Sequence, residues 1–306
     1  MKTIVSLLLL SCSLQAFEYN LVPQKLTSDV YCFFGKPENI SKENGGNMVN
    51  TCFVQTKEGF VVIDSGPTYG YASQAYMQMQ KIAPLPVKYV VNTHDHDDHW
   101  LGNSFYKEKG ALLIGPETYE QNVVPGMHTR MERELGKEIF NKTKIVVLDK
   151  IVKSDYRFTL GGKQFEVKKV VDKAHTSGDL VVMLPEEGVV FAGDLVFNDR
   201  VTSMRDGSIN GAIKALNMLD KLDVKIIVGG HGYRTDKNAT VLLKHYLEEM
   251  KTEILSAIDE DVSLNEITQK VVMPKYKKLK LYDMLHKRNV LDAYRELEFD
   301  TGEEEE

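Results

Sequence analysis

The chain has 306 residues, of which 42% are hydrophobic and 27% are charged, and its formal net charge is −6. This length is enough to bury a substantial core in one large domain or two small ones. The composition is that of an ordinary globular protein, and the negative charge argues against nucleic acid or an anionic membrane as the main partner.

The first sixteen residues differ from the rest of the chain. Lys2 gives a positive start, the residues from Thr3 to Leu14 are apolar or small, and small Ala16 closes the segment. This pattern predicts a secretory signal peptide cleaved after Ala16, because the apolar stretch is too short to span a bilayer as a stable helix. An uncleaved anchor is one alternative, and lipidation at Cys12 is another. We therefore expect a periplasmic or secreted protein without an integral span after cleavage, with a lipoprotein as the second choice.

The rest of the chain alternates short strands with helices. Strands are expected at 29–35, 50–55, 60–64, 87–91, 111–114, 144–152, 158–160, 164–171, 180–184, 189–191 and 225–228. Helices are expected at 73–82, 99–109, 129–140 and 209–222, and mostly helical chain follows residue 237. Strands in two batches with helices between them predict two sheets packed face to face and covered by helices.

Two cysteines, Cys32 and Cys52, remain once Cys12 has left with the signal peptide. They lie on neighbouring expected strands, and an oxidising compartment permits them to form a disulfide. Two small buried hydrophobic residues are an equally good interpretation. Their spacing matches no metal or redox motif.

The clearest chemical signal is segment 93–99, Thr-His-Asp-His-Asp-Asp-His, which directly follows a β-branched strand. His94 and His96 can point the same way, because side chains two apart on an extended backbone share a face. Asp98 and His99 come one turn later and can face a second centre. Imidazole and carboxylate groups suit Zn²⁺, and they also accept iron or manganese.

Three further candidate ligands lie in loops beyond strand ends. His175 precedes Thr-Ser-Gly-Asp, Asp194 ends Phe-Ala-Gly-Asp, and His231 stands in Gly-Gly-His-Gly. Each is weak evidence alone, because a single histidine is more often structural. Together with segment 93–99 they predict a metal site assembled from several loops.

The order His-x-His-x-Asp-His, then His, Asp and Gly-His-Gly, resembles the metallo-β-lactamase superfamily over nearly the whole chain after residue 16. The segment Val62 to Gly66 matches the early strand and turn of that family. The resemblance implies an α/β fold, an αββα four-layer sandwich with a binuclear zinc site at one edge. It assigns His94, His96 and His175 to the first zinc, Asp98, His99 and His231 to the second, Asp194 to the bridge, and Asp64 to orienting the metal-binding loop.

The resemblance also implies a reaction. A hydroxide held between two zinc ions would cleave an ester, thioester or lactam bond, and Asp98 would orient it or receive its proton. A serine, cysteine or threonine nucleophile is not needed, and the sequence holds no Gly-x-Ser-x-Gly elbow.

The branch of the superfamily stays open. Glyoxalase II (hydroxyacylglutathione hydrolase) shares all seven ligands, but its basic glutathione-binding segment is missing after Asp194. Class B β-lactamases usually carry Cys or Ser in place of Asp194, and flavodiiron oxidases carry Glu in place of His96. A mononuclear iron dioxygenase of sulfur oxidation binds a single iron, so some of the seven candidate ligands would bind no metal. The best match in order and length, including the tail from Leu281 to Glu298, is to exported zinc hydrolases found with periplasmic quinoprotein and sulfur-oxidation systems.

Four residues near these motifs are candidate substrate contacts. Trp100 could wall the pocket, although core packing is the commoner role of such a tryptophan. Arg200 and Arg205 could hold a substrate carboxylate through paired hydrogen bonds, with a surface ion pair as the simpler alternative. Tyr233 follows His231, and a solvated loop is equally consistent with its position.

The expected organisation is a signal peptide at 1–16, a catalytic domain at 17–237, and a helical extension at 238–306. The extension packs on the same domain and ends in an acidic tail. We expect a small-molecule substrate and no nucleic-acid partner, and the oligomeric state stays open.

Overall fold

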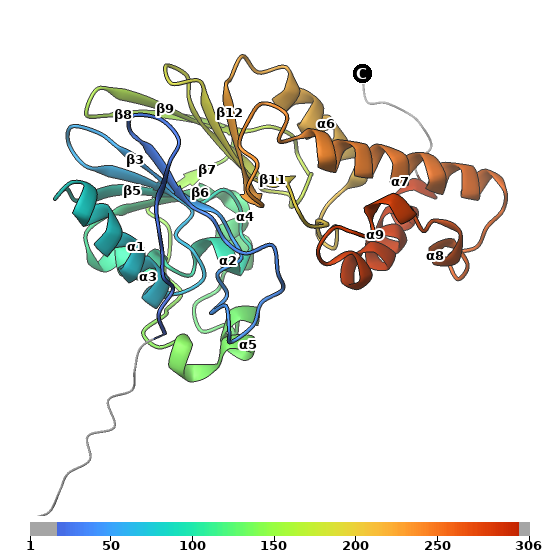
Figure 1. Ribbon diagram of the computed structural model, residues 1–306, viewed down its shortest axis with the longest axis horizontal. Coiled ribbons are helices and arrows are strands. Elements are labelled where there is room, and N and C mark those ends of the chain that lie inside the picture. The colour runs from blue at the N-terminus through green and yellow to red at the C-terminus, as the bar shows by residue number, and fades with distance from the viewer. Residues whose placement is uncertain (1–16, 300–306) are drawn as a thin grey trace, which may run out of the picture.

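The computed structural model describes residues 17–299, so the expected signal peptide and the acidic tail lie outside the described residues. Within them, two β-sheets face each other and helices cover both outer faces (Figure 1). This arrangement confirms the αββα sandwich with C-terminal helices that the sequence predicts. No helix within residues 17–299 combines the length and the apolarity needed to cross a membrane.

The first sheet has seven strands in chain order, antiparallel from β1 to β4 and parallel from β4 to β7. Its strands are β1 (Gln24–Lys25), β2 (Val30–Phe33), β3 (Thr51–Gln55), β4 (Phe60–Ile63), β5 (Val87–Val91), β6 (Leu112–Pro116) and β7 (Lys150–Val152). The strand expected at 144–152 is therefore only three residues long, because pairing with β6 begins at Lys150.

The second sheet has five strands in the order β12-β11-β10-β9-β8 within the described chain. Its strands are β8 (Asp155–Leu160), β9 (Lys163–Lys169), β10 (Leu180–Leu184), β11 (Val189–Phe197) and β12 (Ile226–His231). Each of the nine residues of β11 is buried, because β11 lies inside the sheet and is covered on both faces. Metal-ligand candidates lie beyond the end of β5, inside β11 after a register shift at Gly193, and at the last residue of β12. The expectation that Asp194 and His231 lie in loops beyond strand ends is therefore wrong, because β11 continues to Phe197 and β12 to His231.

Three apolar layers hold the sandwich together. The middle layer lies between the sheets and contains buried residues of both, such as Ile63 and Phe191. A second layer joins the first sheet to α1 (Tyr69–Ile82) and α3 (Asn103–Glu108). The third joins the second sheet to α6 (Ile209–Asp220) and α7 (Val241–Asp259).

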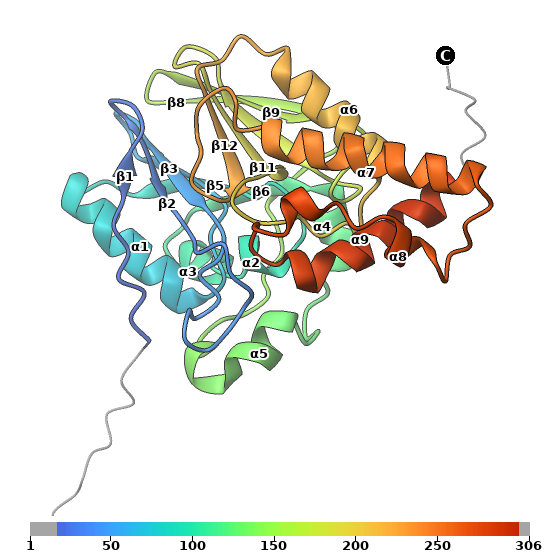
Figure 2. The ribbon, with the colours of Figure 1, turned by 45° about the vertical axis from the view of Figure 1, so that its right-hand side comes forward.

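Shorter helices surround one edge of the sandwich, and the C-terminal helices follow α7 (Figure 2). The former are α2 (Asp97–Trp100), α4 (Glu117–Asn122) and α5 (Arg130–Ile139). The latter are α8 (Ile267–Lys270), a 3₁₀ turn (Pro274–Tyr276) and α9 (Tyr282–Leu297), which packs against α7.

The two cysteines left open by the sequence form a disulfide. Cys32 on β2 lies directly opposite Cys52 on β3, and both side chains are buried in the layer between the sheets. The bond therefore joins neighbouring strands of the first sheet.

Candidate metal centre

The histidine cluster sits where β5 ends and α2 begins. The backbone of His96 is extended, and the helix starts at Asp97. Asp98 and His99 then lie on the first turn of α2 and are buried. The turn thus lets four side chains within six residues reach two neighbouring positions.

Two glycines allow the other ligand loops to approach closely. Gly193 has φ +51°, and a Cβ placed on it would lie 2.5 Å from Oγ1 of Thr93. A Cβ on Gly230 would lie 2.0 Å from Oδ1 of Asp194. Any larger residue would push the loops apart, so Gly-Asp and Gly-Gly-His are geometric requirements of this site.

The structure brings all seven predicted ligands together in two adjoining sets. Within each set the candidate ligand atoms lie within 4.8 Å of one another. The first set contains His94, His96, His175 and Asp194, and the second contains Asp98, His99 and His231.

Asp194 connects the two sets through its two carboxylate oxygens. Oδ2 lies 3.1 Å from Nε2 of His175 and 3.6 Å from Nε2 of His94, both in the first set. Oδ1 lies 3.2 Å from Nε2 of His99 and 3.3 Å from Nε2 of His231, both in the second. One carboxylate therefore faces both positions, as a bridging ligand does.

Asp64 fixes the metal-binding loop through hydrogen bonds to Thr93 and His99. Its Oδ2 accepts from Nδ1 of His99 at 2.8 Å and from Oγ1 of Thr93 at 2.9 Å, and its Oδ1 accepts from the Thr93 amide at 2.8 Å. Oγ1 of Thr93 lies 3.1 Å from Nδ1 of His94 and can accept its proton. Because the outer nitrogens of both rings carry the protons, each Nε2 keeps a lone pair for a metal.

The remaining histidines are held by other elements. Nδ1 of His231 donates to the carbonyl of Met48 at 2.6 Å. Nε2 of His96 lies 3.0 Å from Oδ2 of Asp206, so its Nδ1 faces the first set. Asp179 accepts from the amides of His175 and Thr176, which fixes the loop that carries His175.

The donor set fits metal ions. Nε2 of His94, Nε2 of His99 and Oδ1 of Asp194 are buried without a well-directed hydrogen bond among the described residues. Buried polar atoms without partners are rare and costly in folded proteins, so these three fit atoms that bind a metal ion. Imidazole nitrogens and carboxylates in two sets of three or four suit Zn²⁺.

The buried charges perturb one another. Burial holds the pKa of His94 well below its usual value, which favours the neutral ring that metals require. Burial would also lower the pKa of His99, but the carboxylates of Asp194, Asp64 and Asp98 outweigh it and raise that pKa well above its usual value. Burial opposes ionisation of Asp194, yet His231 and His99 hold its pKa well below the usual range. Such clustered, opposed shifts are typical of functional sites.

Comparison with known proteins decides the family. The model of the Metallo-beta-lactamase superfamily matches residues 44–231, which include all seven ligand candidates. The chain belongs to the metallo-β-lactamase superfamily.

Relatives within the superfamily differ in how much they share with this chain. A hydroxyacylglutathione hydrolase from Brucella ovis is 34% identical over 110 residues, which make up 36% of this chain and 34% of that protein. The match thus spans about a third of the length of this curated relative.

Solved structures show the same fold. A metallo-beta-lactamase from Pontibacter korlensis has a TM-score of 0.60 and 24% identity, covering 74% of this chain and 99% of its own. A stereoselective inverting sec-alkylsulfatase from Pseudomonas sp. has a TM-score of 0.65 and 16% identity, covering 91% and 50%. At these identities the likeness concerns the fold alone.

Arg130 is a charged partner of the superfamily site that the sequence analysis missed, as is Asp206 beside His96. Nη2 of Arg130, the first residue of α5, donates to Oδ1 of Asp97 at 2.9 Å and to Oδ1 of Asp98 at 3.1 Å. Oδ2 of Asp98 faces Nε2 of His231 at 3.6 Å. No sequence spacing signals this contact, because 32 residues separate Arg130 from Asp98.

Neither of the two aromatic candidates for substrate contact lines the metal pocket, although Trp100 lines the groove beside it. Trp100 is 1% exposed, packs on Tyr119 and donates from its indole to the carbonyl of Asp95. These contacts are those of a core tryptophan, and a contact between Trp100 and a substrate stays a prediction. Tyr233 is 51% exposed, lies near Phe34, and is not among the residues that line the metal pocket.

The two arginine candidates line the metal pocket, but in different ways. Arg205 is exposed and pairs with Asp206 at 2.6 Å, which matches the simpler alternative of a surface ion pair. Arg200 departs from that simpler interpretation, because it is 8% exposed and lies beside the ring of His231, with Nη1 3.5 Å from Nδ1. Beyond this pocket a groove of about 680 Å³ opens between segments 95–100, 122–130 and 173–177 and residues 205–206.

Proposed function

We propose that this protein is an exported zinc-dependent hydrolase that uses a binuclear site to cleave an ester, thioester or lactam bond. The observation that carries the proposal is the carboxylate of Asp194, whose two oxygens face the two ligand sets. Two zinc ions held in these sets would activate a water molecule at neutral pH and polarise the scissile carbonyl.

Asp98 is the residue we assign to proton handling. Arg130 holds its Oδ1, and its Oδ2 faces the second ligand set. His99, Arg130 and His231 keep its pKa well below the usual range against the opposing effect of burial, so it is a carboxylate at neutral pH. A fixed, ionised carboxylate at this place can orient the attacking group and accept its proton.

Arg200 supports an anionic substrate. Three arginines line the metal pocket, and two of them pair with carboxylates, Arg130 with Asp97 and Asp98 and Arg205 with Asp206. Arg200 has no carboxylate within salt-bridge distance in the described part of the chain. A buried guanidinium without a counter-ion is costly, so a substrate carboxylate is a fitting partner.

The relatives favour the thioesterase branch of the superfamily, so a thioester is the first substrate to test. The name hydroxyacylglutathione hydrolase belongs to the Brucella protein, and the shared ligand pattern supports a thioester as one substrate of this chain. The missing basic glutathione-binding segment after Asp194 argues for a different acyl carrier. A class B β-lactamase activity stays the second candidate, supported by the fold and by Arg200, which suits an anionic substrate.

The domain bounds and the export of the protein are also proposals. We assign residues 17–237 to the catalytic domain and 238–306 to a helical extension packed on it through α7 and α9. The export proposal rests on the sequence of residues 1–16 alone, with cleavage after Ala16 or, as the second choice, lipidation at Cys12. A mature N-terminus at Phe17, found by N-terminal sequencing of the native protein, would support cleavage, and recovery with Met1 intact would contradict it.

The deciding experiment measures metal content and hydrolysis on the same sample. Wild type and Asp98→Ala are purified gently and tested on a chromogenic cephalosporin, S-lactoylglutathione and an aryl ester, with and without chelator. We expect about two zinc ions per chain and turnover that chelator abolishes, falling at least about a hundredfold in Asp98→Ala. One iron per chain without hydrolysis would overturn the proposal in favour of a mononuclear iron dioxygenase.

A further inference from the structure

His96 differs from the other ligand candidates in what holds its outer nitrogen. The rings of His94, His99 and His231 are held by Thr93, Asp64 and the Met48 carbonyl. Nε2 of His96 instead lies 3.0 Å from Oδ2 of Asp206, which belongs to the loop 198–208 between β11 and α6. The orientation of this ring therefore depends on where that loop sits.

The chemistry of the contact suits a positioning role. A carboxylate that accepts the proton of one ring nitrogen leaves the lone pair of the other free and fixes the plane of the ring. Nδ1 of His96 lies 2.9 Å from Nε2 of His175, inside the first ligand set. Arg205 donates to the same Asp206 oxygen at 2.6 Å and restrains the carboxylate.

The loop that carries Asp206 is held in its middle by α9. The side chain of Asn289 is fully buried, and its Nδ2 donates to the carbonyl of Thr202 at 2.8 Å. Its Oδ1 accepts from the amide of Met204 at 3.1 Å. One amide side chain of α9 thus satisfies a backbone acceptor of the loop four residues before Asp206 and a backbone donor two residues before it.

Further contacts hold the ends of the loop. At its start, the amide of Val201 donates to the carbonyl of Lys280 at 2.9 Å. At its end, Glu296 of α9 accepts from Oγ of Ser208 at 2.7 Å and from the amide of Ile209 at 2.9 Å. The C-terminal extension therefore contacts the loop on both sides of Asp206.

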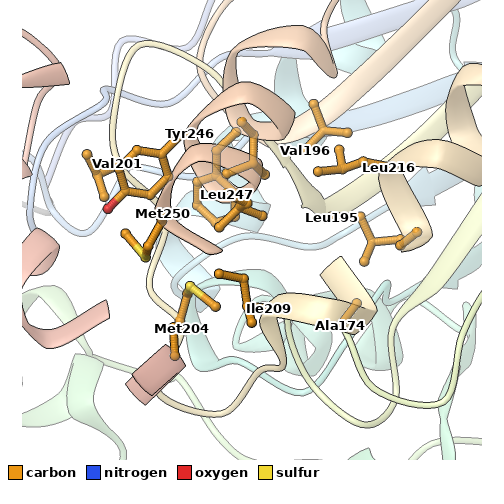
Figure 3. Packing of buried hydrophobic residues seen from close by; sticks show 14 of the residues in the cluster. Ala174, Leu195, Val196, Val201, Met204, Ile209, Leu216, Tyr246, Leu247 and Met250 are labelled. Carbon is orange, nitrogen blue, oxygen red and sulfur yellow. The ribbon is translucent and has the colours of Figure 1, made fainter. Parts of the chain in front are cut away.

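Apolar packing reinforces these hydrogen bonds. Figure 3 shows Val201, Met204 and Ile209 of the loop region gathered around Tyr246, Leu247 and Met250 of α7. All six residues are buried in one cluster. Movement of the loop would break this packing as well as the bonds to α9.

From these contacts we propose that Asp206 is a positioning residue for His96, and that the C-terminal extension keeps it in place through Asn289 and Glu296. The extension then contributes to the first metal position without supplying a ligand. This inference rests on the proposed binuclear centre, and it gives the helices after residue 237 a function in the chemistry.

Stepwise metal affinity tests the first half of the inference. Zinc binding to metal-free full-length protein is measured by competition with a chromogenic chelator, which reports the two dissociation constants separately. We expect Asp206→Ala to weaken one of the two by about tenfold or more and to leave the other unchanged. Asp206→Asn keeps a hydrogen-bond acceptor and should recover part of the loss. Asp172→Ala is the matched control, since that fully exposed aspartate pairs only with Lys169 in the described structure.

A double-mutant cycle tests the second half. Asn289→Ala should weaken the same dissociation constant several-fold in the wild-type background and have no further effect in Asp206→Ala, because both act through His96. Glu296→Gln, on the other side of the loop, should behave alike and replaces Asn289→Ala if that variant does not fold.

The outcomes separate this inference from the proposed function. Wild-type affinity at both positions in Asp206→Ala would overturn the positioning role, and full additivity in the cycle would overturn the role of the extension. A wild-type protein that binds two zinc ions but hydrolyses nothing would contradict the proposed hydrolase and leave the affinity comparison valid. A wild-type protein that binds no metal would overturn both.

Discussion

Two parts of the metal pocket are supported in different ways. We call the buried surroundings of Asp64 the floor and the exposed surroundings of Asp206 the rim. On the floor, Asp64 is 2% exposed and makes three hydrogen bonds to Thr93 and His99. On the rim, the side chain of Asp206 is 49% exposed and shares one oxygen between His96 and Arg205. The floor belongs to the sandwich core, and the rim belongs to a loop held by the C-terminal helices. A rigid floor fixes the chemistry, while a rim on a loop can be reshaped for a substrate.

The largest effect on metal binding is expected from Asp194, which faces both ligand sets. Asp194→Ala should remove both metals, because its two oxygens face both ligand sets. Metal analysis after desalting measures this, with Asp172→Ala as the control. Retention of one tightly bound metal would show that the two positions are independent.

The second effect compares floor and rim directly. Asp64→Ala leaves the buried Nδ1 of His99 and the Thr93 hydroxyl without an acceptor, so we expect zinc affinity to fall by about a hundredfold, more than in Asp206→Ala. Chelator competition on both variants gives the ratio. Equal losses would contradict the distinction between a buried floor and an exposed rim.

The third effect concerns the whole sandwich. Chelation should lower the thermal midpoint of unfolding by about 5 °C or more, because metals that bind only the folded state stabilise it by mass action. Calorimetry with and without chelator measures the shift, and added zinc should restore it. An unchanged midpoint would mean that the ligand sets close without metal.

The fourth effect is confined to the rim. Arg200→Met should raise the KM of the carboxylate-bearing cephalosporin about tenfold and leave that of a neutral aryl ester unchanged, because a charge-assisted hydrogen bond is lost. Arg200→Lys should retain part of the difference, and metal content should not change. An equal rise for both substrates would point to a structural role for Arg200.

The smallest effect on the site is expected from the disulfide. Replacing Cys32 and Cys52 by serine should lower the free energy of unfolding by about 2–4 kcal/mol, because the bond constrains the unfolded chain. Zinc affinity should stay at the wild-type value, since the bond lies between the sheets and away from the ligands. A loss of metal would show that the first sheet transmits strain to the floor.

The sequence alone determined the ligand residues and the sandwich. The spacing of His94, His96, Asp98 and His99 is local, and so are the glycines beside Asp194 and His231, so these residues can be recognised without knowing the fold. Alternating strands and helices likewise predicted two covered sheets, although strand β7 was expected to be longer than three residues.

The tertiary structure alone decided which groups support those ligands. Asp206 meets His96 across 110 positions of the chain, Asn289 meets Met204 across 85, and nothing in the sequence around Arg200 predicted that its side chain would be buried. These contacts depend on how the loop after β11 packs against α7 and α9. Local spacing fixes which side chains share a strand or a turn, but packing between distant segments fixes which of them meet.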